Sequence, residues 1–279
     1  MWAHRPNLPS HTPLSSLLIA LLLVSRASAH DDGVTLRGID TQLSRDGSAV
    51  SLVLLRAEIE RADRQWDEAE ADLALAERMA PGTAALARCR AALALDRGRP
   101  EAALRALEGC ADPELMRDPR TPWLEGEALR RLERYDEAAA VMDDALAREV
   151  GATAERYLAR AGVAEHREAE GASGAIAVLE RGLERTPGAW NLLSRLLELE
   201  IGLERYDSAL ARLDVVIRRA QRPETFLAQR GDVLARAGRG WEAREAWTLA
   251  LAALESRPKQ SAADRDLAAK LHASLTAPP

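Results

Sequence analysis

The feature that most constrains this chain is a small residue that recurs about every 34 residues. Six alanines mark the recurrence, at intervals of 34, 35, 37, 34 and 34 residues: Ala69, Ala103, Ala138, Ala175, Ala209 and Ala243. A large apolar residue follows each alanine after four positions, so each copy carries one apolar stripe along a helix. Self-similarity at this period is typical of an array of helical repeats.

Each copy is expected to contain a second helix ahead of the alanine. Most copies have another small residue twelve positions earlier, in an Ala- or Gly-rich stretch: Ala57, Ala91, Gly126 and Gly231. Prolines at positions 81, 187, 223 and 258 close copies, because a residue without an N–H ends a helix. Helix formers dominate and β-branched residues are sparse, so the pattern predicts an all-α chain of helix hairpins.

The sixth copy resembles the tetratricopeptide repeat family. Its first helix has the expected leucines and glycine and its second helix the expected small and aromatic residues: Leu227, Gly231, Leu234, Ala243, Trp247 and Ala250. The resemblance covers roughly residues 50–258. It implies a right-handed α-solenoid of about six helix hairpins with capping helices, of a kind that binds other proteins.

Residues 1–29 have the pattern of a secretory signal peptide. His4 and Arg5 precede an apolar run, and Ala27 and Ala29 form an A-x-A cleavage pattern. The apolar run is too short to span a bilayer comfortably, although an uncleaved membrane anchor is the alternative. The abundance of Ala and Arg indicates a GC-rich bacterial genome. We therefore expect a cut after Ala29 and a periplasmic or secreted protein that begins at His30.

Both ends of the array are expected to be capped, because a terminal repeat otherwise exposes its stacking face. The expected organisation is a signal peptide (1–29), an N-terminal cap (30–49), the repeat array (50–258) and a C-terminal capping helix with a tail (259–279). Apolar residues share one helical face in each cap: Leu36, Ile39 and Leu43 in the first, and Leu267, Leu271 and Leu275 in the second.

Net charge limits the classes of partner. The whole chain has a formal net charge of −6, and loss of residues 1–29 removes two arginines and no acidic residue. An acidic protein has no general attraction for nucleic acid or for anionic lipid surfaces. We expect a protein or peptide partner, no nucleic acid, and no stable membrane insertion after signal cleavage.

Two cysteines, Cys89 and Cys110, both fall in the second copy. They are expected on its two helices, and an even pair in an oxidising compartment is a disulfide candidate. A loop of this size would stabilise the fold by on the order of 3 kcal/mol. Two buried free thiols are the alternative, because the Cα separation cannot be derived from spacing.

Arginine replaces the family's usual leucine at one position of the first helix. This position holds Arg56, Arg90, Arg160, Arg195 and Arg230, with Glu125 in the third copy. A buried guanidinium needs a carboxylate, and four acidic residues of the second helices are candidates: Asp72, Asp143, Glu180 and Asp214. One interpretation is a ladder of ion pairs, and the other is a row of cations for an anionic ligand.

The resemblance also implies which residues line a concave partner-binding face. They are Leu54, Glu58, Arg61, Arg88, Arg120, Trp123, Glu127, Arg130, Leu158, Trp190, Leu193, Asp232 and Arg236. Exposed Trp with Arg is typical of interface hot spots. Trp123 and Trp190 have an alternative place, the aromatic core position of their copies. The Lys and Asn residues of the family's carboxylate-clamp members are absent from these positions.

No constellation in the sequence indicates catalysis. The chain after residue 29 has only three histidines, His30, His166 and His272, too few for a His-rich metal centre. Catalytic and phosphate-binding motifs such as G-x-S-x-G, H-E-x-x-H and the P-loop are absent. We expect a non-catalytic adaptor without a cofactor or metal, which binds a peptide or helix of a partner. The alternative is an auxiliary or regulatory subunit of a secreted hydrolase or of an envelope-assembly machine.

Overall fold

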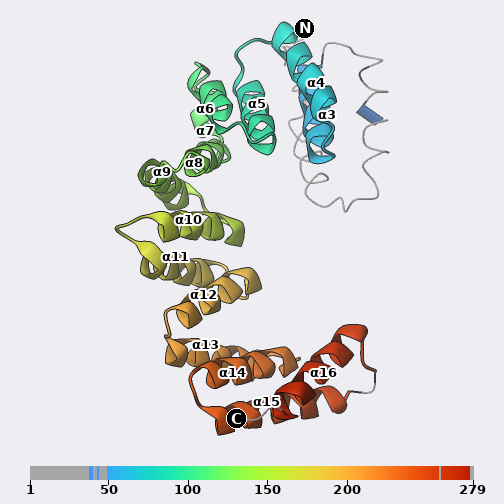
Figure 1. Ribbon diagram of the computed structural model, residues 1–279. Helices are drawn as coiled ribbons and strands as arrows, with labels where there is room; N and C mark the ends of the chain where they lie inside the picture. Colours follow the sequence, from blue (N-terminus) through green and yellow to red (C-terminus); the bar gives the residue numbers. More distant parts are fainter. Residues whose placement is uncertain (1–37, 40–42, 44–48, 258, 277–279) are drawn as a thin grey trace, which may run out of the picture. The chain divides into compact units, whose positions relative to one another are not determined.

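The computed structural model describes residues 38–39, 43, 49–257 and 259–276 (Figure 1). These residues form fourteen helices, α3 to α16, and no strand, which confirms the all-α prediction. The chain divides into two compact units, Met1–Val141 (unit 1) and Met142–Pro279 (unit 2). The expected signal peptide and most of the expected N-terminal cap lie outside the described residues.

Unit 1 is built from successive helix pairs. Its helices are α3 (Val50–Ala62), α4 (Trp66–Met79), α5 (Ala84–Asp96), α6 (Pro100–Glu108), the short α7 (Glu114–Arg117), α8 (Thr121–Arg131) and the first half of α9 (Tyr135–Arg148). Helix α3 packs on α4, and α5 packs on α6. Helix α8 then packs on α6 and α5, so each new helix covers an apolar side of the preceding pair.

Unit 2 continues with the same alternation. It contains the end of α9, α10 (Ala154–His166), α11 (Gly171–Arg185), α12 (Trp190–Gly202), α13 (Tyr206–Arg219), α14 (Glu224–Arg236), α15 (Gly240–Glu255) and α16 (Ala262–Thr276). The pairs α10/α11 and α14/α15 have close internal packing, and α12 and α13 lie between them in the stack. Helix α16 packs on α15.

The six alanines that define the repeat lie in the contacts between helices. Each of them is 0% exposed, as expected for the apolar stripe of the second helix in all six copies. The first helix of a hairpin comes close to the second helix at its own small residue, such as Gly231. At Gly231, an added Cβ would lie 2.4 Å from the Trp247 ring, so only glycine fits there. Small residues thus let the two helices of a hairpin meet, and the α-solenoid prediction is confirmed.

The turn inside the hairpin also repeats. Five hairpins have a residue with positive φ five positions before the alanine: Arg64 (61°), Gly98 (69°), Glu133 (59°), Glu204 (57°) and Gly238 (75°). Glycine adopts this left-handed conformation readily, whereas other residues do so at an energetic cost. The turn geometry is therefore set by helix packing even where the sequence does not offer glycine.

Three of the expected arginine ion pairs are present. Arg56 Nε donates to Asp72 at 2.6 Å, Arg160 Nη2 to Asp143 at 2.8 Å, and Arg230 Nε to Asp214 at 2.8 Å. The ion-pair interpretation of the recurring arginine is therefore confirmed at these three positions.

Two other arginines have different partners from those expected. Glu180 accepts a hydrogen bond from Arg212, and Arg195 donates to Glu165 and Glu198, which were not among the candidate acids. Arg195 is followed by a leucine instead of the usual small residue. Arg90 pairs with Glu77, which the sequence pattern did not single out.

The C-terminal helix α16 is bound by apolar and ionic contacts. Leu271 is 3% exposed and packs with Leu254 of α15. Buried Asp264 accepts hydrogen bonds from Arg222 at 3.0 Å and from Arg257 at 2.9 Å. At the other end, the described residues Ile39 and Leu43 are buried or packed against the core of the first hairpin.

Candidate functional site

The first-helix residues of unit 1 form a charged face. We define this face by Glu58, Arg61, Arg88, Arg120, Glu127 and Arg130. Arg61 donates to Glu58 at 2.9 Å and also to Asp96 of the next hairpin. Burial disfavours the charged guanidinium, but the two carboxylates outweigh burial and raise the pKa of Arg61. Arg61 is thus a fixed cation that links α3 to α5.

Asp118 joins the next two arginines of the charged face. It accepts two hydrogen bonds from the Arg120 side chain, at 3.0 and 2.8 Å, and lies 3.2 Å from Arg88 Nε. Burial of Asp118 opposes ionisation, but the hydrogen bonds from Arg120 outweigh burial and lower the pKa of the carboxyl. Arg88 and Arg120 therefore share one ionised carboxylate.

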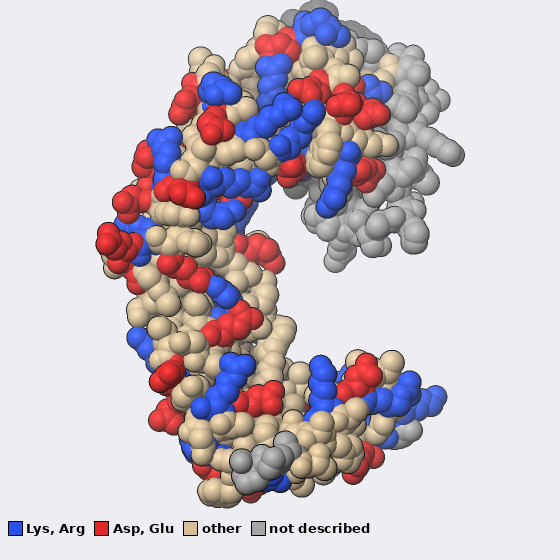
Figure 2. All heavy atoms as spheres, in the orientation of Figure 1, with Lys and Arg blue, Asp and Glu red and all other residues tan. Residues whose placement is uncertain are grey.

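Glu127 completes the charged face on α8. It accepts hydrogen bonds from Arg130 at 2.7 and 2.8 Å and from Arg131 at 2.6 Å. Figure 2 shows acidic and basic side chains interspersed over the helices of unit 1. The arginines of this face are therefore held by its two glutamates and by the neighbouring Asp96 and Asp118, and little of their charge is uncompensated.

Three residues expected to bind a partner lie in the core instead. Leu54 is 8% exposed, Trp123 is 5% exposed and Leu193 is 9% exposed. Leu54 and Leu193 pack in the clusters formed by neighbouring hairpins, so little of their surface remains for a partner. For Trp123 the structure has the alternative that the sequence left open, the aromatic core position.

Unit 2 presents a different, aromatic face. We define it by Leu158, Trp190, Phe226, Asp232 and Arg236. Trp190, the first residue of α12, is 41% exposed. Its ring centroid lies 4.9 Å from that of Phe226, and the rings cross at 68°. This is the edge-to-face arrangement that aromatic pairs prefer.

Asp232, on the same helix as Phe226, is the acidic residue of this set. Trp247 Nε1 donates to Asp232 Oδ1 at 3.0 Å. Burial raises the pKa of Asp232, while Trp247 and the nearby Arg236 and Lys270 act in the opposite direction. Trp247 itself packs between the cores around α13 and α16. The hydrogen bond thus fixes the carboxylate beside a second indole.

The two cysteines are free thiols in the structure, so the disulfide is absent. Cys89 lies within α5, but Cys110 lies beyond the end of α6, where its thiol donates to the carbonyl oxygen of Gly82 at 3.4 Å. Helix residues rise about 1.5 Å each, which puts Cys89 about 7 Å further along α5 than Ala84. Cys110 therefore lies level with the start of α5 rather than opposite Cys89.

Within the described residues, no group of three or more His, Cys, Asp and Glu side chains is arranged to hold a metal ion. In the same residues, no helix combines the length and apolar character that crossing a membrane requires.

Comparison with known families identifies the repeat. Residues 151–273 match the family model of the Tetratricopeptide repeat-like domain. These residues therefore form a tetratricopeptide-repeat-like domain, and the described chain as a whole has the fold of tetratricopeptide repeat proteins. Comparison with the curated proteins found no match.

Solved structures share this fold at low sequence identity. The C-terminal part of a TPR repeat-containing protein from Cytophaga hutchinsonii is 11% identical, with 90% of this chain and 98% of that chain covered and a TM-score of 0.59. A tetratricopeptide repeat protein from Parabacteroides merdae is 15% identical, with 92% and 98% covered and a TM-score of 0.52. The APC/C hetero-tetramer Cut9-Hcn1 contains a chain that is 15% identical, with 85% and 46% covered and a TM-score of 0.54.

Proposed function

We propose that this protein is a non-catalytic, protein-binding scaffold of the bacterial periplasm. It holds a peptide or a helix of a partner protein against the aromatic face of unit 2. The observation that carries the proposal is the edge-to-face pair of the exposed Trp190 and the half-buried Phe226.

The aromatic pair has the properties of a binding hot spot. Trp is enriched among the few interface residues that contribute most of the binding free energy. Phe226 packs against the core of α12 to α15, and it holds the Trp190 ring from one side. Because Trp190 is already positioned, a partner that covers it orders few side chains on binding.

The charged face of unit 1 is suited to a different role in binding. Its arginines and carboxylates are paired with each other, so a partner charge must displace an existing ion pair. Such a face disfavours partners that cannot replace these ion pairs, which affects selectivity more than affinity. The scaffold therefore obtains its affinity from the aromatic face of unit 2.

Two further observations support the proposal. The pattern of residues 1–29 is that of a secretory signal peptide, which supports export to the periplasm. The fold supports protein binding, since the structurally similar Cut9-Hcn1 protein is part of a hetero-tetramer.

A crosslinked pull-down from the native periplasm tests the proposal. The mature wild type is compared with Trp190→Ala and with the matched control Trp241→Ala, which removes a 73% exposed Trp from α15 of the same unit. We expect one partner to be captured by the wild type and by the control, and to be lost from Trp190→Ala while its circular dichroism is unchanged. Equal capture by all three proteins would exclude the aromatic face, and no partner in any sample would argue against the scaffold.

A further inference from the structure

The C-terminal ends of α11 and α13 carry a group of exposed arginines that shares no residue with the aromatic face. We call this group the arginine edge and define it by Arg181 and Arg185 of α11 and by Arg218 and Arg219 of α13. All four residues are exposed, and among the described residues none of them has an ion pair or a hydrogen bond through its side chain. Their positive charges are therefore free to interact with a ligand.

Contacts between α11 and α13 bring the two pairs of arginines to one edge of unit 2. Arg212 of α13 donates a hydrogen bond to Glu180 of α11. Further along the two helices, Leu183 of α11 and Ile217 of α13 pack against the same core cluster. Because the contacting residues advance in the same direction along both helices, the helices run parallel and their C-terminal ends lie side by side.

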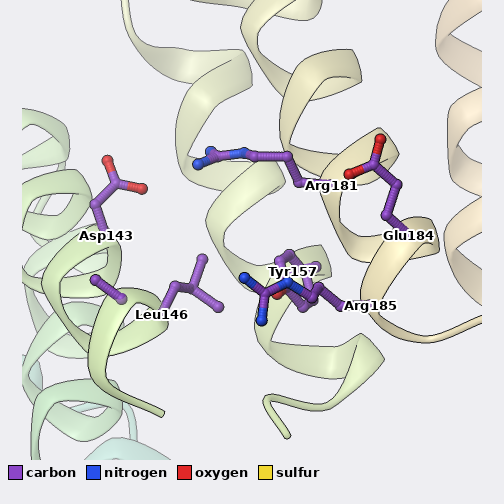
Figure 3. Close-up of a pocket in the computed structure, with 7 residues that line it drawn as sticks. Asp143, Leu146, Tyr157, Arg181, Glu184 and Arg185 are labelled. Atoms are coloured by element: carbon purple, nitrogen blue, oxygen red, sulfur yellow. The ribbon is translucent and has the colours of Figure 1, made fainter. Parts of the chain in front are cut away.

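The acidic residues nearby compensate little of this charge. Three of them already bind other arginines: Asp143, Glu180 and Asp214. Glu184 has no ion pair within the part of the chain that the structure describes. Figure 3 shows the guanidinium groups of Arg181 and Arg185 reaching toward α9, while the Glu184 carboxylate lies apart from both. Four arginines against one glutamate leave an excess of positive charge at the arginine edge.

A fully exposed valine lies beside the arginine edge. Leu146 and Ala147, at the end of α9, line one cavity together with Arg185 of α11 (Figure 3). Val150 follows three residues after Ala147, in the loop between α9 and α10, and it is 100% exposed. Three residues span at most about 10 Å, so Val150 lies near the end of α11. An apolar side chain thus projects into solvent next to unpaired cations.

Helix polarity explains only part of this arrangement. Cations in the last turn of a helix are stabilised by the helix dipole, which accounts for single arginines at helix ends. It does not account for Arg181, which lies one turn before the end of α11, or for the exposed Val150. The combination is better explained by a ligand that has both negative charge and an apolar part.

We infer that the arginine edge docks on an anionic phospholipid surface, with lipid phosphates at the four arginines and Val150 at the apolar boundary beneath the headgroups. The arginines are spread over the ends of two neighbouring helices, so they can contact several headgroups at once. Basic residues near an anionic membrane each contribute to binding, and a buried apolar side chain adds to it. A soluble polyanion would bind the arginines but leave Val150 in water.

The negative net charge of the chain does not exclude this contact. Charges further apart than about 8 Å are largely screened at physiological ionic strength. Headgroups therefore interact with the local group of arginines and only weakly with acidic residues elsewhere in the chain. The expectation of no attraction to anionic lipid concerns the average charge of the protein, and the arginine edge is a local exception to it.

Vesicle co-sedimentation tests the inference. The mature protein is mixed with vesicles of phosphatidylglycerol and phosphatidylcholine, and separately with vesicles of phosphatidylcholine alone. We expect binding to the anionic vesicles to be stronger by about tenfold or more. Most of this binding should be lost when the salt concentration is raised to about 1 M, where the screening length is only about 3 Å.

Variants assign the binding to the arginine edge. Arg181→Gln with Arg185→Gln should weaken binding to the anionic vesicles by about 25-fold, because each arginine near such a surface contributes about fivefold. Arg218→Gln with Arg219→Gln should weaken it similarly. Val150→Ser, which removes an apolar side chain without changing the charge, should weaken it by about threefold.

The matched control is Arg99→Gln with Arg105→Gln in unit 1. These two arginines are exposed and, like those of the arginine edge, have no side-chain ion pair among the residues described. The control removes the same charge as each arginine pair of α11 or α13. It should bind the anionic vesicles as the wild type does.

Three results would overturn the inference: no binding to vesicles, equal binding to anionic and neutral vesicles, or equal weakening by the control pair. Binding of soluble polyglutamate without binding of vesicles would also overturn it, and would assign the edge to an acidic protein. None of the variants changes the aromatic face, so the proposed scaffold function is tested separately.

Discussion

Units 1 and 2 are built from the same hairpin but present different surfaces on their first helices. In unit 1 this surface is a set of arginines and carboxylates bonded to each other, as in the Arg61, Glu58 and Asp96 group. In unit 2 it is an aromatic pair, the exposed Trp190 and the half-buried Phe226. The six alanines that define the repeat are equally buried in both units. Helix packing therefore constrains these positions and does not constrain the residues on the surface.

The two units can also be compared by the burial of one ion-pair group in each. Arg160 of unit 2 is 3% exposed and bonds both Asp143 and Glu170, whereas the Arg61 side chain of unit 1 is 26% exposed. Removal of one partner from a buried pair leaves uncompensated charge in the interior, whereas exposed pairs contribute little. The Arg160 group of unit 2 is therefore a buried ion-pair network, whereas the Arg61 group of unit 1 lies nearer the surface.

The largest expected effect comes from breaking the buried pair. Arg160→Ala should lower the free energy of unfolding by about 3 kcal/mol, the low end of the range for buried pairs, because Asp143 retains some contact with water. The matched change Arg61→Ala should lower it by about 1 kcal/mol or less. Urea unfolding followed by circular dichroism measures both values. Equal losses for the two variants would show that burial does not distinguish the units.

A smaller, stabilising effect is expected from Glu125 in unit 1. Glu125 occupies the position where the other hairpins have arginine, and burial and the like charges of Glu108 and Glu137 raise the pKa of its carboxyl. Glu125→Arg would replace this repulsion by an ion pair with Glu108. We expect a gain of about 1 kcal/mol in the free energy of unfolding at pH 7.

The pH dependence of this gain has a definite sign. A carboxyl whose pKa is raised by folding binds more protons in the native state than in the unfolded state. Below the unfolded-state pKa, Glu125 is protonated in both states and costs the wild type no stability. As pH rises through the raised pKa of the native state, the buried carboxyl ionises and the free energy of unfolding falls. The advantage of Glu125→Arg should be larger at pH 7 than at pH 4, and urea midpoints at the two pH values measure it. A gain that is larger at pH 4 would contradict this account.

The smallest effect should be the same in both units. Glu133 of unit 1 and Glu204 of unit 2 have positive φ in the hairpin turn, where two other hairpins have glycine. Glu133→Gly and Glu204→Gly should each stabilise the protein by about 0.5 kcal/mol, because glycine adopts this conformation without a Cβ clash. Thermal unfolding checks both variants. Destabilisation by either change would show that the glutamate makes a contact worth more than the backbone strain.

The sequence predicts the parts of the fold that packing requires. The buried alanines recur because two helices can approach closely only at small residues. The spacing is therefore kept in all six copies, although the residues around the alanine differ. The partner of each arginine is less predictable. Arg56, Arg160 and Arg230 find the expected acids, but Arg195 has Glu165 and Glu198 within reach and bonds those instead. A long arginine side chain can reach several carboxylates, and the sequence spacing does not predict which of them it bonds.

The aromatic residues show why the candidate site was only partly predictable. Trp123, Phe226 and Trp190 stand 15, 17 and 19 residues before the alanine of their own hairpins. A helix turns about 100° per residue, so each step of two residues moves the side chain to a different face. Trp123 is thus buried and Trp190 exposed, although both are tryptophans near a helix start. The distance in residues from the alanine, rather than from an expected helix start, distinguishes the buried Trp123 from the exposed Trp190. The same distance indicates Phe226 as a candidate surface residue.

The most direct test of the difference between the units is site-specific photo-crosslinking in the native cell. The photoreactive residue p-benzoylphenylalanine is placed at Trp190 on the aromatic face, at Arg120 on the charged face, and at Trp241 as an exposed control in unit 2. Our account predicts a covalent adduct with a single partner from position 190, a weaker adduct or none from position 120, and none from position 241. An adduct with the same partner from position 120 or 241, but not from position 190, would contradict the claim that the aromatic face is the main contact.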